Sequence, residues 1–237
     1  MSARVSKKRP SPERTPGSGG ASLPGGAVAP DPRHIPVKAR VGDEALVAHR
    51  RGQIVAAAVE LFSEQGYYRT TVQEIAAHAG ISTGLVYQYV EDKDDVLLLA
   101  ILEVVDAYGR EIPAALADIG DPLERFRTAV TTYCRVVDRL RDATVLAYRS
   151  TRSLSPAHRK LVMQAELKSN ELIAHTIQDC VDAGVFADDV DVEFLTHQMV
   201  MFAHSWALKH WRLSQRYTLD DYIERGLAMF LRASLRA

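Results

Sequence analysis

Apolar residues recur at helical spacing from about residue 43 onward, and this pattern limits the fold more than any other feature of the chain. Leu61 and Phe62, for example, follow Ile54 at the spacing that puts all three on one helix face. Nowhere do apolar and polar residues alternate in the way that is typical of a strand. The sequence therefore predicts an all-α protein with roughly nine helices.

Glycines, prolines and capping residues predict where these helices begin and end. The first helix is expected from about residue 43 to Gly66, and a helix that starts after Asp92 is expected to reach about Gly109. A break is expected over 112–121, because this segment contains Pro113 and a glycine. The later helices are predicted over 122–140, 143–153, 156–183, 191–213 and 219–235.

Two short helices, predicted over 72–79 and 83–90, form a helix-turn-helix. Thr71 and Glu74 have the spacing of a capping box, which opens the first of them. Gly80 lies between the helices and can adopt the left-handed conformation that a sharp turn requires. The pair therefore has the geometry of a DNA-reading unit, although such a unit can also serve only for packing.

The second short helix leaves a mostly outward surface that suits the major groove of DNA. The amide of Gln88 can pair with adenine, the Thr83 hydroxyl with several base edges, and Leu85 with a thymine methyl. Tyrosine hydroxyls and the ammonium of Lys93 suit phosphates, which position a protein without specifying sequence. This outward surface is predicted to comprise Thr83, Gly84, Leu85, Tyr87, Gln88 and Tyr89.

The stretch IVAAAVELFSEQGYYRTTVQEIAAHAGISTGLVYQYVEDKDDVLLLAIL, residues 54–102, closely resembles the N-terminal DNA-binding domain of TetR-type repressors, the TetR/AcrR family. The resemblance implies that the outward surface just described faces double-stranded operator DNA. It also implies that Thr71 and Gln73 touch DNA and that Lys93 holds a phosphate. Leu85 replaces a common threonine, so an unusual base preference is expected there. Val90 stands where the family usually has phenylalanine, which reduces core packing mildly.

The chain divides into three predicted parts. Residues 1–42 are predicted to be a disordered basic arm, because they are rich in Pro, Gly, Ser and Ala and poor in large apolar side chains. The first 40 residues hold eight Lys or Arg against two acids, so the arm can supplement DNA binding. A solvated tail, or a start codon assigned too far upstream, explains the arm equally well. Residues 43–92 are predicted to form the DNA-binding domain, and 93–237 the domain for effector binding and dimerisation.

Composition narrows the class of protein. The 237 residues are 47% apolar, which is enough for a sizeable core, yet no apolar run approaches the roughly 20 residues that span a membrane. The N-terminus lacks the apolar segment of a signal peptide, and Cys134 and Cys180 are too few for a disulfide framework. A cytoplasmic protein without a membrane partner is expected.

Dimerisation is expected at the last two long helices. Leu195, Met199 and Trp206 lie on one apolar stripe of the segment 191–213, and a second stripe, which includes Phe194, lies on another side. The resemblance implies that these helices pair with their symmetry mates in a four-helix bundle, giving a homodimer on a palindromic operator. A monomer core is the simpler alternative.

An effector pocket is expected between the central helices, because apolar walls with a few polar groups make a small-molecule site. Plain core packing is the alternative for each candidate. The candidates are Tyr133, Val137, Tyr148, Arg149, Arg152, Met163, Leu167, Asn170, Phe202 and Trp206.

The segment AYRSTRSLSPAHRKLVMQAELKSNELIAHTIQDCVDAGVF, residues 147–186, resembles the acyl-CoA-responsive, FadR-like branch of the family. Arg149, Arg152, Arg159 and Lys160 can meet the phosphates of coenzyme A, or they can form a solvated helix face.

The sequence thus favours a ligand-responsive repressor that releases its operator when a small apolar effector binds. An acyl-CoA is the favoured effector, and a drug or a free lipid is the alternative. An enzyme is not expected, because the sequence has no nucleophile–base pairing and no Gly-rich phosphate loop. Glu171 and His175 are spaced for helix-surface pairing and not for a metal site, so neither a metal nor a cofactor is expected. An architectural DNA-binding protein without an effector is a third possibility.

Overall fold

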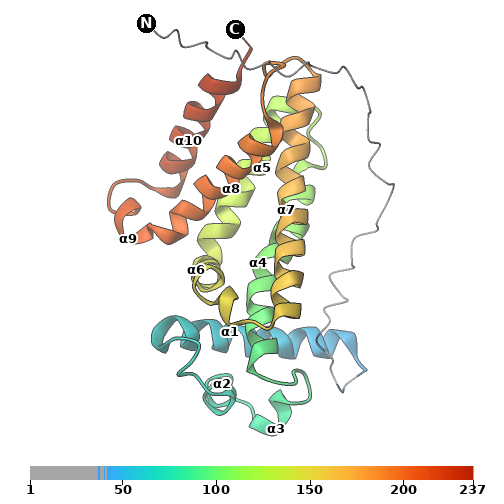
Figure 1. Cartoon of the computed structure of the whole chain (residues 1–237), viewed down its shortest axis with the longest axis vertical. Helices are drawn as coiled ribbons and strands as arrows, with labels where there is room; N and C mark the ends of the chain where they lie inside the picture. Colours follow the sequence, from blue (N-terminus) through green and yellow to red (C-terminus); the bar gives the residue numbers. More distant parts are fainter. Residues whose placement is uncertain (1–36, 38–39, 41, 237) are drawn as a thin grey trace, which may run out of the picture.

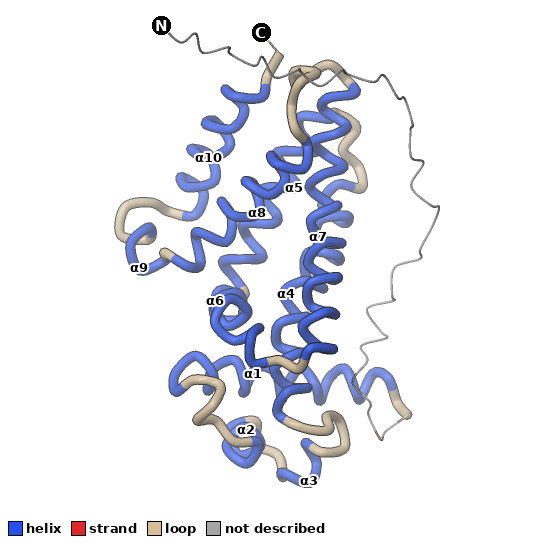
Figure 2. The backbone as a smooth tube through the Cα atoms, in the orientation of Figure 1, coloured by secondary structure: helices blue, strands red, loops and turns tan. Residues whose placement is uncertain are grey.

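The computed structural model describes Val37, Arg40 and residues 42–236, and within these residues the fold is helical. The only extended pairing that they contain is an isolated antiparallel bridge between Phe186 and Leu235. The all-α expectation is therefore confirmed for the described part of the chain (Figure 2). The elements are α1 (Glu44–Gln65), α2 (Val72–His78), α3 (Thr83–Val86), α4 (Lys93–Leu116), α5 (Pro122–Arg139), α6 (Arg141–Ser150), the 3-10 turn η1 (Thr151–Ser153), α7 (Pro156–Asp182), α8 (Val192–Leu208), α9 (His210–Leu213) and α10 (Leu219–Ser234).

The helices form a small head and a longer bundle (Figure 1). Helices α1, α2 and α3 make up the head at the lower end of the view, and α4 runs from the head into the bundle. There α4 packs against α5 and α7, while α8 packs against α5 and α7 from the other side. Helix α6 lies between α1 and α8 and contacts both. Both α4 and α6 therefore connect the head to the bundle.

Side-chain caps begin most of these helices where the sequence predicts. Asp43 accepts a hydrogen bond from the backbone N–H of Leu46 at the start of α1, at 3.1 Å. Asp121, Ser155, Asp191 and Thr218 cap later helices in the same way. Each cap satisfies a backbone donor that the first helical turn leaves free.

Three helix ends differ from the prediction. Helix α4 continues through Pro113 to Leu116, so the expected break shrinks to the loop that follows. Pro113 deprives the Gly109 carbonyl of its donor, but Gly109 and Pro113 are both exposed, so solvent can reach this side of the helix. Helix α3 ends at Val86 and gives way to a turn, and the segment 191–213 is divided at Lys209 into α8 and α9.

The core of the head is not closed by the head alone. Ile54, Ile75 and Val86 pack with the first turns of α4, where residues 96–102 are all buried. Buried side chains from the bundle complete the same cluster: Leu146 of α6, Leu154 after η1 and Val162 of α7. The head and the bundle thus share apolar packing, which couples their positions.

Two residues of the predicted arm lie on the head. Val37 is buried in its core cluster, and the Arg40 backbone N–H donates to the Gln88 carbonyl at 2.8 Å. The prediction of disorder is therefore wrong at these two positions. Residues 1–36, 38–39 and 41 of the arm lie outside the described residues.

Helix α10 approaches α8 closely at one point. The rings of Phe202 and Tyr222 stack with centroids 4.4 Å apart, and the Tyr222 hydroxyl donates to the Phe202 carbonyl at 2.7 Å. A Cβ on Gly226 would lie only 2.0 Å from the Phe202 ring. The absence of a side chain at Gly226 is therefore what lets the ring lie against α10.

The described residues include no helix that is long and apolar enough to cross a membrane.

Candidate nucleic-acid interface and effector cavity

Local hydrogen bonds hold the helix-turn-helix in shape. Thr71 and Glu74 form the expected capping box, with the Thr71 backbone N–H donating to the Glu74 carboxylate at 2.8 Å. Gly80 has a φ of 68°, the left-handed conformation that the turn requires. Ser82 accepts from the Leu85 N–H at 3.2 Å and so caps α3. The predicted capping box and turn are therefore confirmed.

Most of the predicted DNA-facing residues are accessible at the end of the head. Tyr87 is 40% exposed, while Thr83 and Leu85 are half-buried. The other accessible members of the set are Thr71, Gln73, Gly84 and Gln88.

Tyr89 departs from this pattern, because its side chain is only 2% exposed. The helical part of α3 ends at Val86, and the following turn directs Tyr89 inward onto the core of the head. The expectation of an outward Tyr89 is therefore wrong.

Lys93 is bound within the protein. Its ammonium donates to the carbonyls of Tyr67 and Thr70, both at 2.8 Å, and lies 4.4 Å from the centroid of the Tyr67 ring. An ammonium has three N–H groups, so one donor is left over for a further acceptor. Lys93 thus fixes the loop before α2 to the start of α4, whatever it does at a phosphate.

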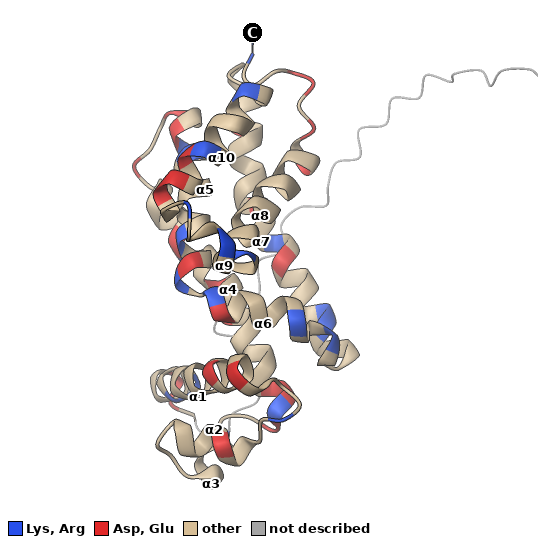
Figure 3. Ribbon diagram, turned by 90° about the vertical axis from the view of Figure 1, so that its left-hand side faces the viewer, with Lys and Arg blue, Asp and Glu red and all other residues tan. Residues whose placement is uncertain are grey.

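Neither α2 nor α3 contains a lysine or arginine. Figure 3 shows the ribbon of α3 without a charged residue, whereas α2 contains the acidic Glu74. Contacts from these two helices to a phosphate would therefore come from hydroxyls, amides, the His78 imidazole and backbone N–H groups.

A cavity of about 320 Å³ lies in the bundle, between α4, α5, α6, α7 and α8. Its walls are mostly apolar, and this volume is within the usual range of small-molecule sites. Four of the ten predicted effector residues line it: Tyr133, Tyr148, Arg152 and Met163.

The other predicted effector residues do not line this cavity. Val137 is fully buried in the core, and Leu167 is 67% exposed. Phe202 stacks on Tyr222, and the Trp206 ring N–H donates to the Asp138 carboxylate at 2.7 Å. Arg149 and Asn170 are also absent from its walls. Helical spacing identifies an apolar face but not which part of that face borders an empty space, which explains these errors.

Four polar side chains that line the cavity meet around the His204 ring, and we call them the tyrosine–histidine cluster: Tyr108, Tyr133, Tyr148 and His204. The Tyr148 hydroxyl lies 2.9 Å from His204 Nδ1. The hydroxyls of Tyr108 and Tyr133 lie 3.3 and 3.2 Å from His204 Nε2, and their rings stack 3.8 Å apart. Burial lowers the pKa of His204 to about 4, so the imidazole is neutral at ordinary pH.

Sequence reasoning missed Tyr108 and His204. The signal for His204 was a single histidine inside the apolar run of α8, which must find partners when buried. Tyr108 gave no signal, because its spacing on α4 is that of any core residue.

The comparisons with known proteins agree with both parts of this arrangement. Residues 54–100 match the family described as bacterial regulatory proteins, tetR family, and 120–233 match the tetracyclin repressor-like C-terminal domain. The HTH-type transcriptional regulator HbdR of Aromatoleum sp. (strain CIB) is 49% identical over 201 residues, which are 85% of this chain and 87% of that protein. The chain belongs to the TetR family.

Two further proteins match this chain at lower identity. The HTH-type transcriptional repressor KstR2 of Rhodococcus jostii (strain RHA1) is 28% identical over 77% of this chain and 89% of its own. The structure of AibR in complex with isovaleryl coenzyme A and operator DNA superposes with a TM-score of 0.65 at 19% identity, over 76% of this chain and 97% of AibR. The predicted fold class, a helix-turn-helix domain followed by a helical domain, is therefore confirmed.

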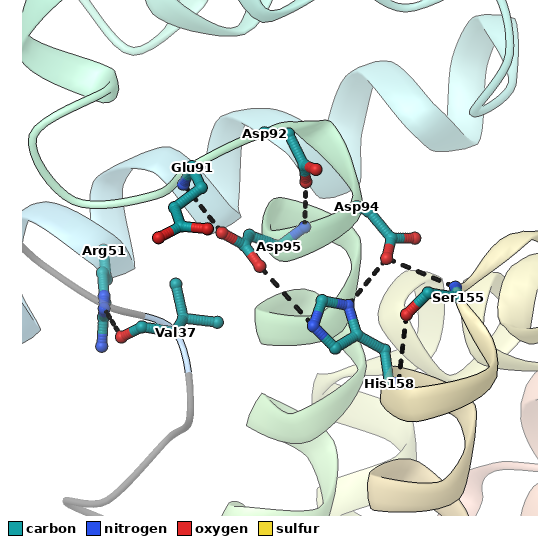
Figure 4. Close-up of polar contacts among 8 residues, drawn as sticks. All are labelled: Val37, Arg51, Glu91, Asp92, Asp94, Asp95, Ser155 and His158. Atoms are coloured by element: carbon teal, nitrogen blue, oxygen red, sulfur yellow. Dashed lines mark hydrogen bonds and ion pairs between the residues drawn. The ribbon is translucent and has the colours of Figure 1, made fainter.

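In this TetR-family chain the first turn of α4 joins the head to the bundle (Figure 4). Asp94 accepts the N–H of Ser155 at 3.3 Å and lies 2.7 Å from Nδ1 of His158, both at the start of α7. Asp95, one residue on, accepts the Glu91 N–H at 2.7 Å. We call the three consecutive residues Lys93, Asp94 and Asp95 the α4 joint.

Together the members of the α4 joint contact three other parts of the protein, and Asp95 as well as Asp94 lies near His158, with 3.7 Å between Asp95 Oδ1 and His158 Nε2. Lys93 holds the loop before α2, Asp94 holds the start of α7, and Asp95 fixes the turn after α3. Burial raises the pKa of Asp95, which the Glu91 N–H partly opposes. Figure 4 also shows Arg51 of α1 close by, bonded to the carbonyl of Val37. A shift of α7 relative to α4 would therefore displace residues directly beside the predicted DNA-facing surface.

Proposed function

We propose that this protein is a ligand-responsive transcriptional repressor, which binds a palindromic operator as a homodimer and releases it when a small apolar effector occupies the bundle cavity. The observation that carries the proposal is the shared use of α7. Val162 and Met163 line the cavity, while about one to two turns earlier the Ser155 N–H donates to Asp94 of the α4 joint and His158 Nδ1 lies 2.7 Å from the same carboxylate. An effector that binds better to a state with shifted α7 would thus alter the position of the head.

At the DNA, we assign the reading surface to seven residues. Gln88 would pair with a base edge, and Tyr87 would bind a phosphate through its hydroxyl. Tyr89, being buried, would support the turn below them. The seven residues are Thr71, Gln73, Thr83, Gly84, Leu85, Tyr87 and Gln88.

A homodimer fits the exposed apolar side chains of the last long helices. Phe194 on α8 and Met229 on α10 are 63% and 58% exposed. Contact with the same helices of a second copy would remove them from water, and two-fold symmetry would place two heads on the two halves of a palindrome.

An acyl-CoA is the effector that we favour. AibR, which shares the fold, was solved with isovaleryl coenzyme A and operator DNA. In this chain Arg152 lies on the cavity wall and Arg149 is exposed nearby in sequence, so both can meet phosphates outside the cavity. A drug-like or free-lipid effector of similar size would use the same apolar walls without those arginines.

The deciding experiment measures operator binding by fluorescence anisotropy, with the DNA upstream of the protein's own gene, at fixed salt, during titration with acyl-CoAs of increasing chain length. Tight, sequence-selective binding that one chain class releases would support the proposal and identify the effector class. Tight binding that every acyl-CoA leaves unchanged would transfer the effector role to non-CoA apolar compounds. Weak binding without sequence preference would contradict the repressor function.

A further inference from the structure

We infer that the effector presents a neutral oxygen acceptor, a hydroxyl or carbonyl oxygen on a small apolar group, to the tyrosine–histidine cluster. This inference rests on the proposed function, because it names the chemistry that the effector cavity selects. On an acyl-CoA, such an oxygen would be a hydroxyl or keto group of the acyl part, or the thioester carbonyl.

A count of hydrogens in the cluster leads to this chemistry. Three tyrosine hydroxyls and one N–H of a neutral imidazole supply four hydrogens. If His204 carries its proton on Nδ1, that N–H donates to Tyr148 and leaves the Tyr148 hydroxyl hydrogen over, with only the weak thioether acceptor of Met201 at 3.5 Å.

The other tautomer also leaves one hydrogen over. If the proton is on Nε2, Tyr148 donates to Nδ1, and the Nε2–H is accepted by Tyr108 or Tyr133. Each of these two hydroxyls carries a hydrogen, and at least one of the two hydrogens has no acceptor within the cluster. In both cases the cluster offers a donor to whatever occupies the cavity.

A ligand must satisfy this donor. When the cavity fills, the hydroxyl is shielded from solvent, and a shielded donor without an acceptor costs binding free energy. A hydrocarbon cannot supply the acceptor, whereas a hydroxyl or carbonyl oxygen can. The cluster therefore acts as a selectivity element in a mostly apolar cavity.

Charge at the cluster favours a neutral oxygen over a carboxylate. The imidazole is neutral, as described above, and burial raises the pKa of all three tyrosines. No cation of the cluster is thus available to compensate a buried carboxylate. The charged side chains that line the cavity, Arg152 and Glu166, have opposite signs and are both exposed to solvent.

The cavity volume limits the size of the selected group. A volume of about 320 Å³ is near the lower end of the usual range for small-molecule sites. A ring or a short chain therefore fits inside, while the bulk of a coenzyme A would remain outside.

The test compares the binding of matched probes to the full-length protein by calorimetry: ethylbenzene, 1-phenylethanol and acetophenone share a carbon skeleton and differ in the oxygen. The ratio of the hydrocarbon dissociation constant to that of an oxygen-bearing probe is measured in wild type, Tyr148→Phe and Tyr133→Phe. Comparing this ratio between proteins cancels the differing solubility of the probes. We expect it to fall about 5-fold in at least one variant, the effect of one hydrogen bond.

Tyr217→Phe serves as the control, because Tyr217 lies in the loop before α10 and does not line the cavity, and its ratio should equal that of wild type. Tyr148 is 46% exposed, so Tyr148→Phe should fold normally. An unchanged ratio in both cavity variants, or no binding of any probe, would overturn the inference. Operator binding that responds to an acyl-CoA would leave the proposed function intact even then, so the two failures are distinguishable.

Discussion

Gly84 lies on the exposed side of α3, and no heavy atom would come within 4 Å of a Cβ placed there. The fold of the monomer therefore does not require a glycine at this position. Close approach of the α3 backbone to the floor of a DNA groove does, because any side chain would hold the two apart. Stability and DNA binding should thus respond oppositely to substitution at Gly84.

Gly84→Leu should lower operator affinity at least about tenfold, because the leucine side chain would hold α3 away from the groove and remove its contacts with the bases. Its unfolding free energy should stay the same or rise by up to about 1 kcal/mol, because leucine favours a helix more than glycine does. Fluorescence anisotropy and urea unfolding measure the two quantities. Gly109→Leu, at an exposed position in α4 with equally open surroundings, is the control and should leave operator binding unchanged. Normal operator affinity in Gly84→Leu would contradict the assigned reading surface.

His204 should make the protein less stable in mild acid. Its pKa is lowered to about 4 in the folded state, so the unfolded chain binds the proton more tightly between that value and its ordinary pKa. The contribution of His204 to the free energy of unfolding is therefore fully present above about pH 6.5 and is lost as the pH falls toward 4. At pH 5 the free energy of unfolding should be lower by about 2 kcal/mol.

Urea unfolding of wild type and His204→Gln at pH 7.5 and pH 5, at one protein concentration, checks this expectation. The stability lost between the two pH values should be smaller in His204→Gln by about 2 kcal/mol. His175→Gln, at an exposed position on α7, should behave like wild type. Equal pH dependence in all three proteins would show that His204 is not held neutral by burial.

For individual residues, the sequence predicts exposed candidate residues better than buried ones. Gly80 and the Thr71 capping box could be predicted because their requirements are local. Tyr89 could not, because its direction depends on α3 ending one turn earlier than the apolar pattern suggests. The partners of His204 come from α4, α5 and α6, so only the fold reveals the cluster.

Among the elements, α8 and α10 pack against each other most closely around Phe202. The Phe202 ring occupies the space that a side chain on Gly226 would need. Because both residues belong to the helices that we place in the dimer, their spacing also affects the surface offered to a second copy.

Gly226→Ala should therefore destabilise the protein by about 2 kcal/mol, the usual cost of overpacking a core. Combining it with Phe202→Leu, which removes part of the ring, should cost less than the sum of the two single changes. Denaturant unfolding of the four proteins in this cycle provides the measurement. Additive effects would contradict the direct contact between the ring and α10.

Helix ends were predictable where a cap or glycine acts locally, and less so where the surroundings decide. The caps at Asp43, Asp121 and Ser155 lie where the sequence places helix starts. Pro113 misled the prediction, because a helix can continue through a proline where solvent can satisfy the carbonyl that the proline leaves free, and Gly109 is exposed. Sequence alone does not tell which side of α4 meets solvent at that turn.

The whole molecule gains its proposed specificity from two copies. A single head touches one half-site, while a dimer binds two half-sites with an effective local concentration that greatly raises affinity. The exposed Met229 of α10 is a direct way to test this, because a charge there would have to be buried in the proposed interface.

Met229→Asp should dissociate the dimer, as measured by analytical ultracentrifugation, and weaken operator binding on the order of 100-fold. Leu167→Asp, on α7 and 67% exposed, is the matched control and should remain dimeric. A dimer that survives Met229→Asp with full operator affinity would exclude this part of α10 from the interface.

The α4 joint also determines which residues must be transferred together when chimeric sensors are built from TetR-family parts. A transplanted reading head would arrive without His158 and Ser155, which belong to the recipient's α7, and without Leu146 and Leu154, which close its core. Such a hybrid would keep its operator and its inducer and yet fail to connect them. Grafting the first turn of α7 along with the head restores the donor's own linkage, so the natural unit of exchange in this protein is discontinuous in sequence.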